Sequence, residues 1–189
     1  MTDACVSIDI RLKAKEISIL RSLIGKELSA IRHDPLFFVN SSLQVVQIDA
    51  ENGSFYLYSH TEPLDYFGTL EDVAVWSLEN KRYEFVDQKN LVETAFKAKI
   101  KNVRVVQENQ RLFKKGVWIY DVWLTRGIVF DFGKSQLSFE KAVWFSEEIY
   151  IQTGCGLVDK FSDVGAFADS DWNEGFTAEC FRETTVLGE

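Results

Sequence analysis

The chain has 189 residues, 46% of them apolar, and a formal net charge of −8. This length suits one well-buried domain, and the apolar content together with only two prolines excludes an intrinsically disordered protein. No apolar run is long enough to span a bilayer, and the first residues lack the basic region and apolar core of a signal peptide. We therefore expect a folded cytoplasmic protein that does not enter a membrane.

The negative charge is concentrated at the C-terminal end of the chain. From Thr153 onward there are eight acidic residues and two basic ones, so the charge of the preceding residues is almost balanced. Recognition of phosphates needs clustered Lys and Arg, so we expect no nucleic-acid binding. The three cysteines, Cys5, Cys155 and Cys180, form neither an even disulfide framework nor a metal-ligand spacing. They are expected to be reduced thiols, as in most cytosolic proteins.

The first part of the chain predicts a strand followed by a helix. Residues 6–12 alternate between apolar and polar side chains, which is typical of a half-buried strand. Residues 17–24 carry apolar side chains at helical spacing, and Gly25 is a candidate for the end of this helix. Residues 27–32 are ambiguous between a strand and further helix.

A β-hairpin is predicted around Asn52-Gly53. Residues 43–49 and 54–59 both have strand character, and Asn-Gly between two strands is the strongest short hairpin signal because both turn residues need a positive φ. After a loop, residues 73–75 predict another strand.

Residues 117–151 carry the strongest strand pattern, and we expect them to form the core sheet. Period-two spacing of apolar residues over several short segments indicates half-buried antiparallel strands. The pattern consists of an apolar run over residues 117–124, alternation at Ile128, Phe130 and Phe132, a turn at Gly133-Lys134, and strands at residues 137–139 and 149–151.

The order of elements in the first half recurs in the second half. Tyr83 and Phe85 indicate a strand, and residues 91–98 predict a second short helix. Three later matches follow in the same order: residues 100–104 resemble 28–32, the hairpin at 128–139 resembles the one at Asn52-Gly53, and 147–151 resemble 71–75. A recurring order of this kind is a recognised sign of repeated units.

The predicted fold is therefore α+β, with mainly antiparallel β-sheets and two short helices. Two pseudo-repeated strand-helix-hairpin units, residues 5–78 and 80–152, would pack together into one domain at residues 1–152. The alternative is two loosely joined domains with a boundary near residues 107–111, the most polar stretch in the middle of the chain.

The titratable residues form no catalytic or cofactor motif. His33 and His60 belong to no motif, and both are expected to be ordinary surface or turn residues. The adjacent acids Glu147 and Glu148 would point to opposite faces of a strand, so they cannot converge on one substrate. Cys155 lies between two glycines but has no histidine nearby in sequence to activate it. We therefore assign no catalytic residue, no metal site and no cofactor.

Residues 153–189 form an acidic segment that contains aromatic residues. Between Asp159 and Glu174, acids alternate with Phe161, Phe167 and Trp172. Exposed aromatics favour association, so these side chains either dock on the domain or form a contact surface together with the acids. Acids speed association with a basic partner, and an aromatic anchor supplies affinity. The candidate partner-binding residues are Asp163, Asp169, Asp171, Trp172 and Glu174.

These features predict a non-catalytic cytoplasmic binding protein. The size, the acidic charge and the lack of catalytic groups fit an immunity- or inhibitor-type protein that sequesters a basic partner protein. One alternative is a small-molecule binder with an apolar cavity between aromatic-rich β-sheets. Another is an enzyme that uses carboxylates gathered from different strands.

Overall fold

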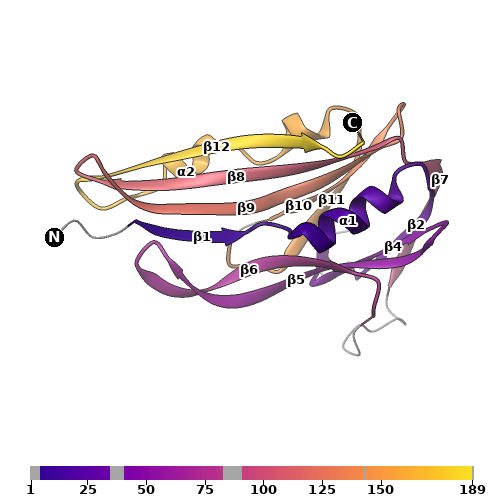
Figure 1. The fold of residues 1–189 in the computed structure, drawn as a ribbon, viewed down its shortest axis with the longest axis horizontal. Coiled ribbons are helices and arrows are strands. Elements are labelled where there is room, and N and C mark those ends of the chain that lie inside the picture. The colour runs from indigo at the N-terminus through magenta and orange to yellow at the C-terminus, as the bar shows by residue number, and fades with distance from the viewer. Residues whose placement is uncertain (1–4, 35–40, 83–90, 143, 189) are drawn as a thin grey trace.

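The structure is a computed structural model that describes residues 5–34, 41–82, 91–142 and 144–188, and these residues form two β-sheets and three short helical segments (Figure 1). The predicted strand at Tyr83 and Phe85 lies outside the described residues. The prediction of mainly antiparallel sheets with two short helices is confirmed at the level of the fold class. The helices are α1 (Ala14–Leu23), the 3-10 turn η1 (Leu157–Lys160) and α2 (Gly165–Ala168).

The larger sheet has seven strands, in the order β12-β8-β9-β10-β11-β3, with β1 also paired to β9. All of its pairings are antiparallel except that of β1, which runs parallel to the first half of β9. Its strands are β1 (Val6–Ile10), β3 (Ser41–Leu43), β8 (Asn102–Lys114), β9 (Val117–Asp131), β10 (Gln136–Lys141), β11 (Glu148–Gly154) and β12 (Phe176–Val186).

The smaller sheet has five antiparallel strands in the order β6-β5-β4-β2-β7. The ambiguous segment after helix α1 is one of them. These strands are β2 (Glu27–His33), β4 (Val45–Ala50), β5 (Gly53–Tyr66), β6 (Thr69–Glu79) and β7 (Val92–Lys99).

One hydrophobic cluster joins the two sheets and helix α1. It includes Leu20 and Leu23 of α1, Leu57 of the smaller sheet, and Phe130 and Phe139 of the larger sheet, all completely buried. Burial of apolar surface is the main favourable term in folding, so this shared core holds the sheets together. In Figure 1 helix α1 lies between the two sheets at one end of the molecule.

Helix α1 forms where the apolar spacing predicted it. At its start the backbone N–H of Lys13 donates to Glu16 Oε2 at 2.9 Å, which places an acid in the first turn, where the helix dipole favours negative charge. It ends at Leu23, and Gly25 two residues later has a φ of +83°, the left-handed conformation common after a helix. Within the described residues, no helix is long and apolar enough to cross a membrane.

The second predicted helix is wrong. Residues 92–99 form strand β7, which pairs with β2 at the edge of the smaller sheet. The segment contains good helix formers such as Ala95, Lys97 and Ala98, but tertiary pairing overrides intrinsic propensity.

The duplication of the chain is not confirmed. Each half does contribute four antiparallel strands that neighbour one another in chain order, β2-β4-β5-β6 and β8-β9-β10-β11. At the position of the matching helix the second half has strand β7 instead, and β7 and β3 each pair with the sheet of the other half. A structural repeat therefore remains a hypothesis, and it applies only to the two sets of four strands, β2-β4-β5-β6 and β8-β9-β10-β11.

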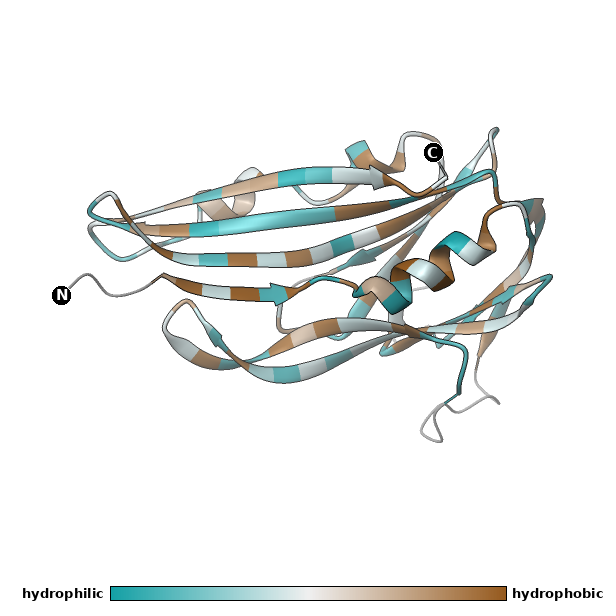
Figure 2. Ribbon diagram, viewed as in Figure 1, coloured by the Kyte–Doolittle hydropathy of each residue, from teal (hydrophilic) through white to brown (hydrophobic). Residues whose placement is uncertain are grey.

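The polar stretch at residues 107–111 is no linker. It lies in the middle of β8, which is paired on one side with β9 and on the other with β12. Figure 2 shows this part of β8 as a continuous hydrophilic stretch within the larger sheet. Glu108, Asn109 and Gln110 are each 1% exposed. The hypothesis of a domain boundary here is therefore wrong.

The C-terminal segment is integrated into the larger sheet. Strand β12 pairs with β8 over eleven residue pairs, from Phe176 opposite Lys114 to Val186 opposite Arg104. Before β12, residues 157–172 carry η1 and α2, and Phe161 and Phe167 are buried there. Phe161 and Phe167 of this segment therefore dock on the rest of the chain.

The predicted hairpin joins β4 to β5, with its turn one residue earlier than expected. Ala50 pairs with Gly53, so Glu51 and Asn52 form the two-residue turn. Of these four residues only Gly53 has a positive φ. The turn is therefore not the type in which both central residues are left-handed.

We expect Gly53→Val to lower the free energy of unfolding by about 1–3 kcal/mol. The φ of Gly53 is +130°, which L side chains rarely adopt, whereas no atom lies within 4 Å of the position that a Cβ would take. The loss would therefore come from the backbone conformation alone. Urea denaturation measures it, with Glu51→Ala as a control in the same exposed turn that should change stability by less than about 0.5 kcal/mol. Equal stability of the two variants would show that residue 53 does not need glycine.

Candidate ligand-binding pocket

An open pocket of about 470 Å³ lies between the larger sheet, the tip of the β5–β6 hairpin and the C-terminal segment. Small-molecule sites commonly have volumes of about 300–1,000 Å³, so the pocket is large enough for a compact organic ligand. Its lining comprises Tyr66 of β5, Glu108 and Gln110 of β8, Arg126 of β9, then Ala142, Trp144 and Phe145 after β10, and residues between Ser162 and Trp172 around α2.

Two polar residues of the floor come from one face of β8. Glu108 and Gln110 are two positions apart, so their side chains point to the same side of the sheet. Residues directly opposite each other in an antiparallel pair share a face, and β12 places Arg182 opposite Glu108 and Cys180 opposite Gln110. The pocket face of the sheet therefore carries a compact polar group.

The third polar residue, Arg126, is placed by a β-bulge. Val106 pairs with Gly127 while the next residue, Gln107, pairs with Thr125, so Arg126 has no partner opposite it on β8. Bulges of this kind redirect a side chain and often lie next to functional sites. Gly127 beside the bulge has no room for a side chain, because a Cβ there would lie 2.5 Å from the carbonyl oxygen of Phe139.

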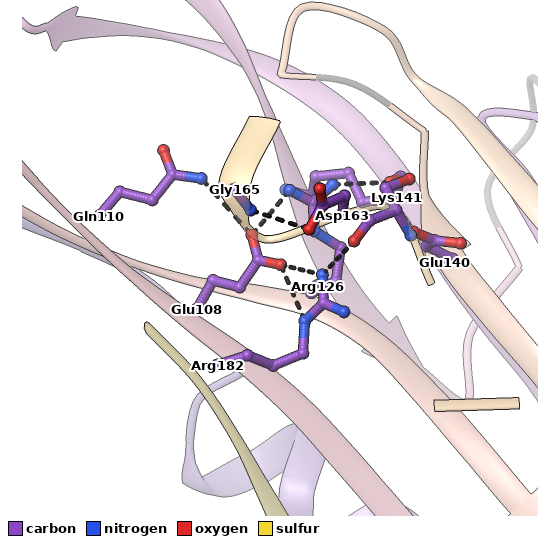
Figure 3. Close-up of polar contacts among 9 residues, drawn as sticks. Glu108, Gln110, Arg126, Glu140, Lys141, Asp163, Gly165 and Arg182 are labelled. Atoms are coloured by element: carbon purple, nitrogen blue, oxygen red, sulfur yellow. Dashed lines mark hydrogen bonds and ion pairs between the residues drawn. The ribbon is translucent and has the colours of Figure 1, made fainter. Parts of the chain in front are cut away.

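Glu108 forms ion pairs with Arg126 of the floor and with Arg182 of β12 (Figure 3). Its Oε2 atom lies 2.7 Å from Arg126 Nη2, and its Oε1 atom accepts a hydrogen bond of 3.0 Å from Arg182 Nε. Burial alone would raise the pKa of Glu108, but the hydrogen bonds and charges of Arg126 and Arg182 outweigh burial and lower it. The carboxylate is therefore ionised at neutral pH, and both of its oxygens are occupied.

The same polar group ties the C-terminal segment to the sheet. Arg182 Nη2 donates to the carbonyl oxygen of Ser162 at 2.6 Å, and the backbone N–H of Ser162 donates to Glu140 Oε1 at 2.7 Å. Figure 3 shows Glu140 and Lys141 beside the arginines. The wall that carries α2 is thus anchored by charged side chains of the sheet.

Lys141 lies behind the floor and is completely enclosed, with 1% exposure. Its Nζ atom donates to the carbonyl oxygen of Ala74, and its own carbonyl oxygen accepts a hydrogen bond of 3.1 Å from Arg126 Nη1. Burial lowers the pKa of Lys141 to about 7, and the nearby charge of Arg126 acts in the same direction. Its backbone therefore helps to orient Arg126, while its side chain faces away into the protein.

The walls of the pocket are aromatic and touch one another. Tyr66 lies 4.8 Å from Trp144 and 4.7 Å from Phe67, measured between ring centres. Phe67 in turn contacts Phe167 at 5.3 Å and Trp172 at 5.5 Å. These separations are in the range of favourable aromatic pairs. Burial raises the pKa of Tyr66 well above its usual value, so its hydroxyl stays protonated.

Two buried polar atoms of the floor have no hydrogen-bond partner within the described residues: Arg126 Nε and Gln110 Oε1. Arg126 is 9% exposed and Gln110 is 1% exposed, and both line the pocket. Leaving a buried polar group unpaired costs about 1–3 kcal/mol, so such atoms in a native protein call for an explanation. We therefore take these two atoms as the candidate contacts of a bound ligand.

The predicted partner-binding residues are all exposed or half-buried and lie on one segment around α2. Three of them, Asp163, Asp171 and Trp172, line the pocket, whereas Asp169 and Glu174 do not. Asp163 Oδ1 accepts a hydrogen bond from the backbone N–H of Gly165 at 3.0 Å, and Trp172 Nε1 donates to the carbonyl oxygen of Phe167 at 3.0 Å. Their role in binding a partner remains a proposal.

The sequence reasoning missed the floor of the pocket. Glu108 and Gln110 are separated by one residue in a predicted polar stretch, and Arg126 precedes a glycine inside an apolar region. Residues 107–111 are all polar, so no alternation in the sequence sets Glu108 and Gln110 apart from their neighbours.

The other titratable candidates do not assemble into a site. His33 is buried, contrary to the expectation of a surface or turn residue, and burial lowers its pKa. His60 is half-buried and lies 3.1 Å from Glu62. Cys155 is exposed, and all three cysteines are free thiols. Among the described residues, no group of three or more His, Cys, Asp or Glu could hold a metal ion.

Comparison with known proteins found no family model that matches this sequence, and no curated protein or solved structure with significant similarity to it. Function must therefore be argued from the pocket itself.

Proposed function

We propose that this protein is a binding protein for a small organic molecule, held in the pocket between the larger sheet and the C-terminal segment. The observation that carries the proposal is the pair of buried, unpaired atoms, Arg126 Nε and Gln110 Oε1, at the floor of an aromatic-walled pocket. Apolar walls with a few convergent polar groups are the common pattern of small-molecule sites. Unlike the apolar cavity between β-sheets that was expected from the sequence, this pocket has a polar floor.

Binding is favoured over catalysis because the charged groups of the floor are engaged with one another. Both oxygens of Glu108 accept hydrogen bonds from arginines, so it is a poor candidate for a general base. Lys141 directs its Nζ atom to Ala74, away from the pocket lining. The remaining carboxylates of the lining, Asp163 and Asp171, are exposed.

The proposal is tested by filling the pocket. We expect native mass spectrometry or a thermal-shift screen of a compound library to find a ligand for the natural chain, and Ala166→Trp to abolish its binding. Ala166 is exposed and lines the pocket, so an indole there would occupy ligand space without entering the core. Asn173→Trp is the matched control, because Asn173 is exposed on the same segment but outside the lining. A ligand that binds equally to Ala166→Trp would show that this pocket is not its site.

A second candidate function is supported by the charge of the same segment. Asp163, Asp169, Asp171 and Glu174 are all exposed, and none of them forms an ion pair with another described residue. Unpaired surface acids attract a basic protein and orient it. We therefore also propose an acidic contact surface for a basic partner protein, as in an immunity- or inhibitor-type protein that acts in the cytoplasm.

For this candidate, the combined change Asp169→Asn and Asp171→Asn should slow association with a basic partner that co-purifies in stoichiometric amount. The effect should shrink as salt rises, because exposed charges are screened within about 8 Å at physiological ionic strength. Association rates at low and high salt measure it. Trp172→Ala is unsuitable as a test because its indole packs on Phe67 and Phe167, so its loss would destabilise the segment without any partner. Unchanged association at low salt would exclude the acids from the contact.

A further inference from the structure

We infer that the ligand of this pocket is a neutral or cationic planar ring compound whose edge carries an acceptor beside a donor, as in an amide or a lactam. This inference rests on the proposed function and names the chemical class of the ligand. It follows from three properties of the pocket: the two unpaired atoms of the floor, the charge of the lining, and the shape of the walls.

The two unpaired atoms lie at the same end of the pocket. Arg126 Nη2 and Gln110 Nε2 both donate to one oxygen, Glu108 Oε2, at 2.7 and 3.4 Å. Arg126 Nε and Gln110 Oε1 are each bonded to the same carbon as the donating nitrogen, so they flank this shared contact. Because the Gln110 amide turns its NH₂ group to the carboxylate, its oxygen is left for another donor.

Together these atoms offer a ligand one donor and one acceptor. Arg126 Nε–H requires an acceptor on the ligand, and Gln110 Oε1 requires a donor. A carbonyl group next to an N–H supplies both in a single planar edge. A hydrocarbon would leave both atoms unpaired, and a ligand with acceptors only would place an oxygen against the oxygen of Gln110.

The charge of the lining argues against an anionic ligand. Its ionisable residues at neutral pH are one cation, Arg126, and three anions, Glu108, Asp163 and Asp171. Glu108 is shared between Arg126 and Arg182 of β12, so this buried group carries one net positive charge, and with the two exposed acids the site has a net charge of −1. A phosphate or carboxylate would be repelled by both acids, whereas a neutral or cationic ring would not.

The walls suit a flat ring. Tyr66 and Trp144 come from one side, the hairpin tip and the segment after β10, while Phe167 and Trp172 come from the segment around α2. Ligand rings stack on such faces, and a cationic ring gains further attraction from the electron-rich surface of the indoles.

The experiment uses the full chain and three probes of nearly equal shape: the bicyclic lactam quinolone, N-methylquinolone, and quinoline carboxylate. Fluorescence of Trp144 and Trp172 reports binding. We expect quinolone to bind on the order of tenfold more tightly than N-methylquinolone, which lacks the donor, and than the anionic carboxylate. In Gln110→Met, which removes the acceptor but keeps the length of the side chain, the two uncharged probes should bind equally. Gln107→Met is the matched control, since it makes the same change on the opposite face of β8 and should keep the preference.

The outcomes separate this inference from the proposed function. Equal binding of all three probes to the natural chain, or a preference that survives in Gln110→Met, would overturn the amide-type ligand while leaving a small-molecule site. If Gln110→Met fails to fold, the relative affinities of the three probes for the natural chain still test the inference. If none of the three probes binds, the inference is overturned too, and the library screen with Ala166→Trp decides separately whether the pocket binds any small molecule.

Discussion

Glu108→Gln should lower the free energy of unfolding by about 3–5 kcal/mol, the size expected when one partner of a buried ion pair is removed. The side chain of Glu108 is 1% exposed, and those of Arg126 and Arg182 are 11% and 15% exposed. Without the carboxylate, two positive charges would remain close together in a poorly solvated site. The amide cannot compensate for either charge.

A matched control is provided by a second glutamate–arginine pair. Glu93 Oε2 lies 2.7 Å from Arg32 Nη2, the same separation as between Glu108 and Arg126, but the side chain of Glu93 is 51% exposed. Exposed pairs contribute about 0–1 kcal/mol, so Glu93→Gln should have a small effect. Urea unfolding of both variants measures the difference. Equal losses would mean that burial does not determine the strength of the Glu108 pair.

The loss should also depend on pH. The pKa of Glu108 is lowered in the folded protein, so its carboxylate stabilises the fold above the unfolded pKa of about 4.3, and this contribution is lost as pH falls further. The stability difference between the natural chain and Glu108→Gln should therefore be constant near neutral pH and shrink in acid. A difference that grew in acid would contradict an ionised Glu108.

Many strand positions could be predicted from the sequence because apolar and polar side chains alternate where one face of a strand is buried. Leu137 and Phe139 lie on a strand that the alternation predicted, and they pair with Phe130 and Ile128. Among the strands that were missed, β7 alternates weakly, since its side chains are mostly exposed at the edge of the sheet. Its strand conformation depends on pairing with β2, which is far away in the sequence, so the composition of residues 92–99 alone does not predict it.

Three residues that line the pocket, Asp163, Asp171 and Trp172, were singled out in the sequence as candidates for binding a partner, whereas the residues of the floor were not. Acids and aromatics around Trp172 are conspicuous because they are unusual in a tail. Arg126 depends on a bulge, which exists only when β8 and β9 are paired. Glu108 is neutralised by Arg182, which is 74 residues away in the chain. An ion pair between residues far apart in the chain produces no periodic pattern in the sequence.

The second large effect concerns Lys141. Relative to Lys141→Met, the natural chain should gain on the order of 4 kcal/mol of stability between about pH 7 and pH 10. The folded pKa is about 7, because Lys141 is completely buried and lies near Arg126. The unfolded pKa is about 10.4. Between these values the unfolded chain binds more protons than the folded protein, so stability rises with pH.

The comparison with a variant is needed because other groups titrate in the same range with the opposite sign. Burial and the charge of Glu108 raise the pKa of Cys180 to about 12, whereas an unfolded cysteine titrates near 8.5. The folded protein therefore keeps a proton that the unfolded chain loses, and this lowers stability as pH rises. Both proteins contain Cys180, so its effect cancels in the difference between them.

Lys15→Met is the matched control, since the side chain of Lys15 is 68% exposed on helix α1. Urea unfolding of the natural chain and both variants at several pH values gives the three curves. The difference for Lys141→Met should rise with pH by far more than the difference for Lys15→Met, whose side chain is exposed. If both were flat, Lys141 would keep its charge in the folded protein, and the enclosed side chain would need a counter-charge that its hydrogen bond to Ala74 does not supply. A rising difference would instead show that the protein tolerates a lysine behind the pocket floor by releasing its proton, so that Arg126 remains the positive group of the pocket.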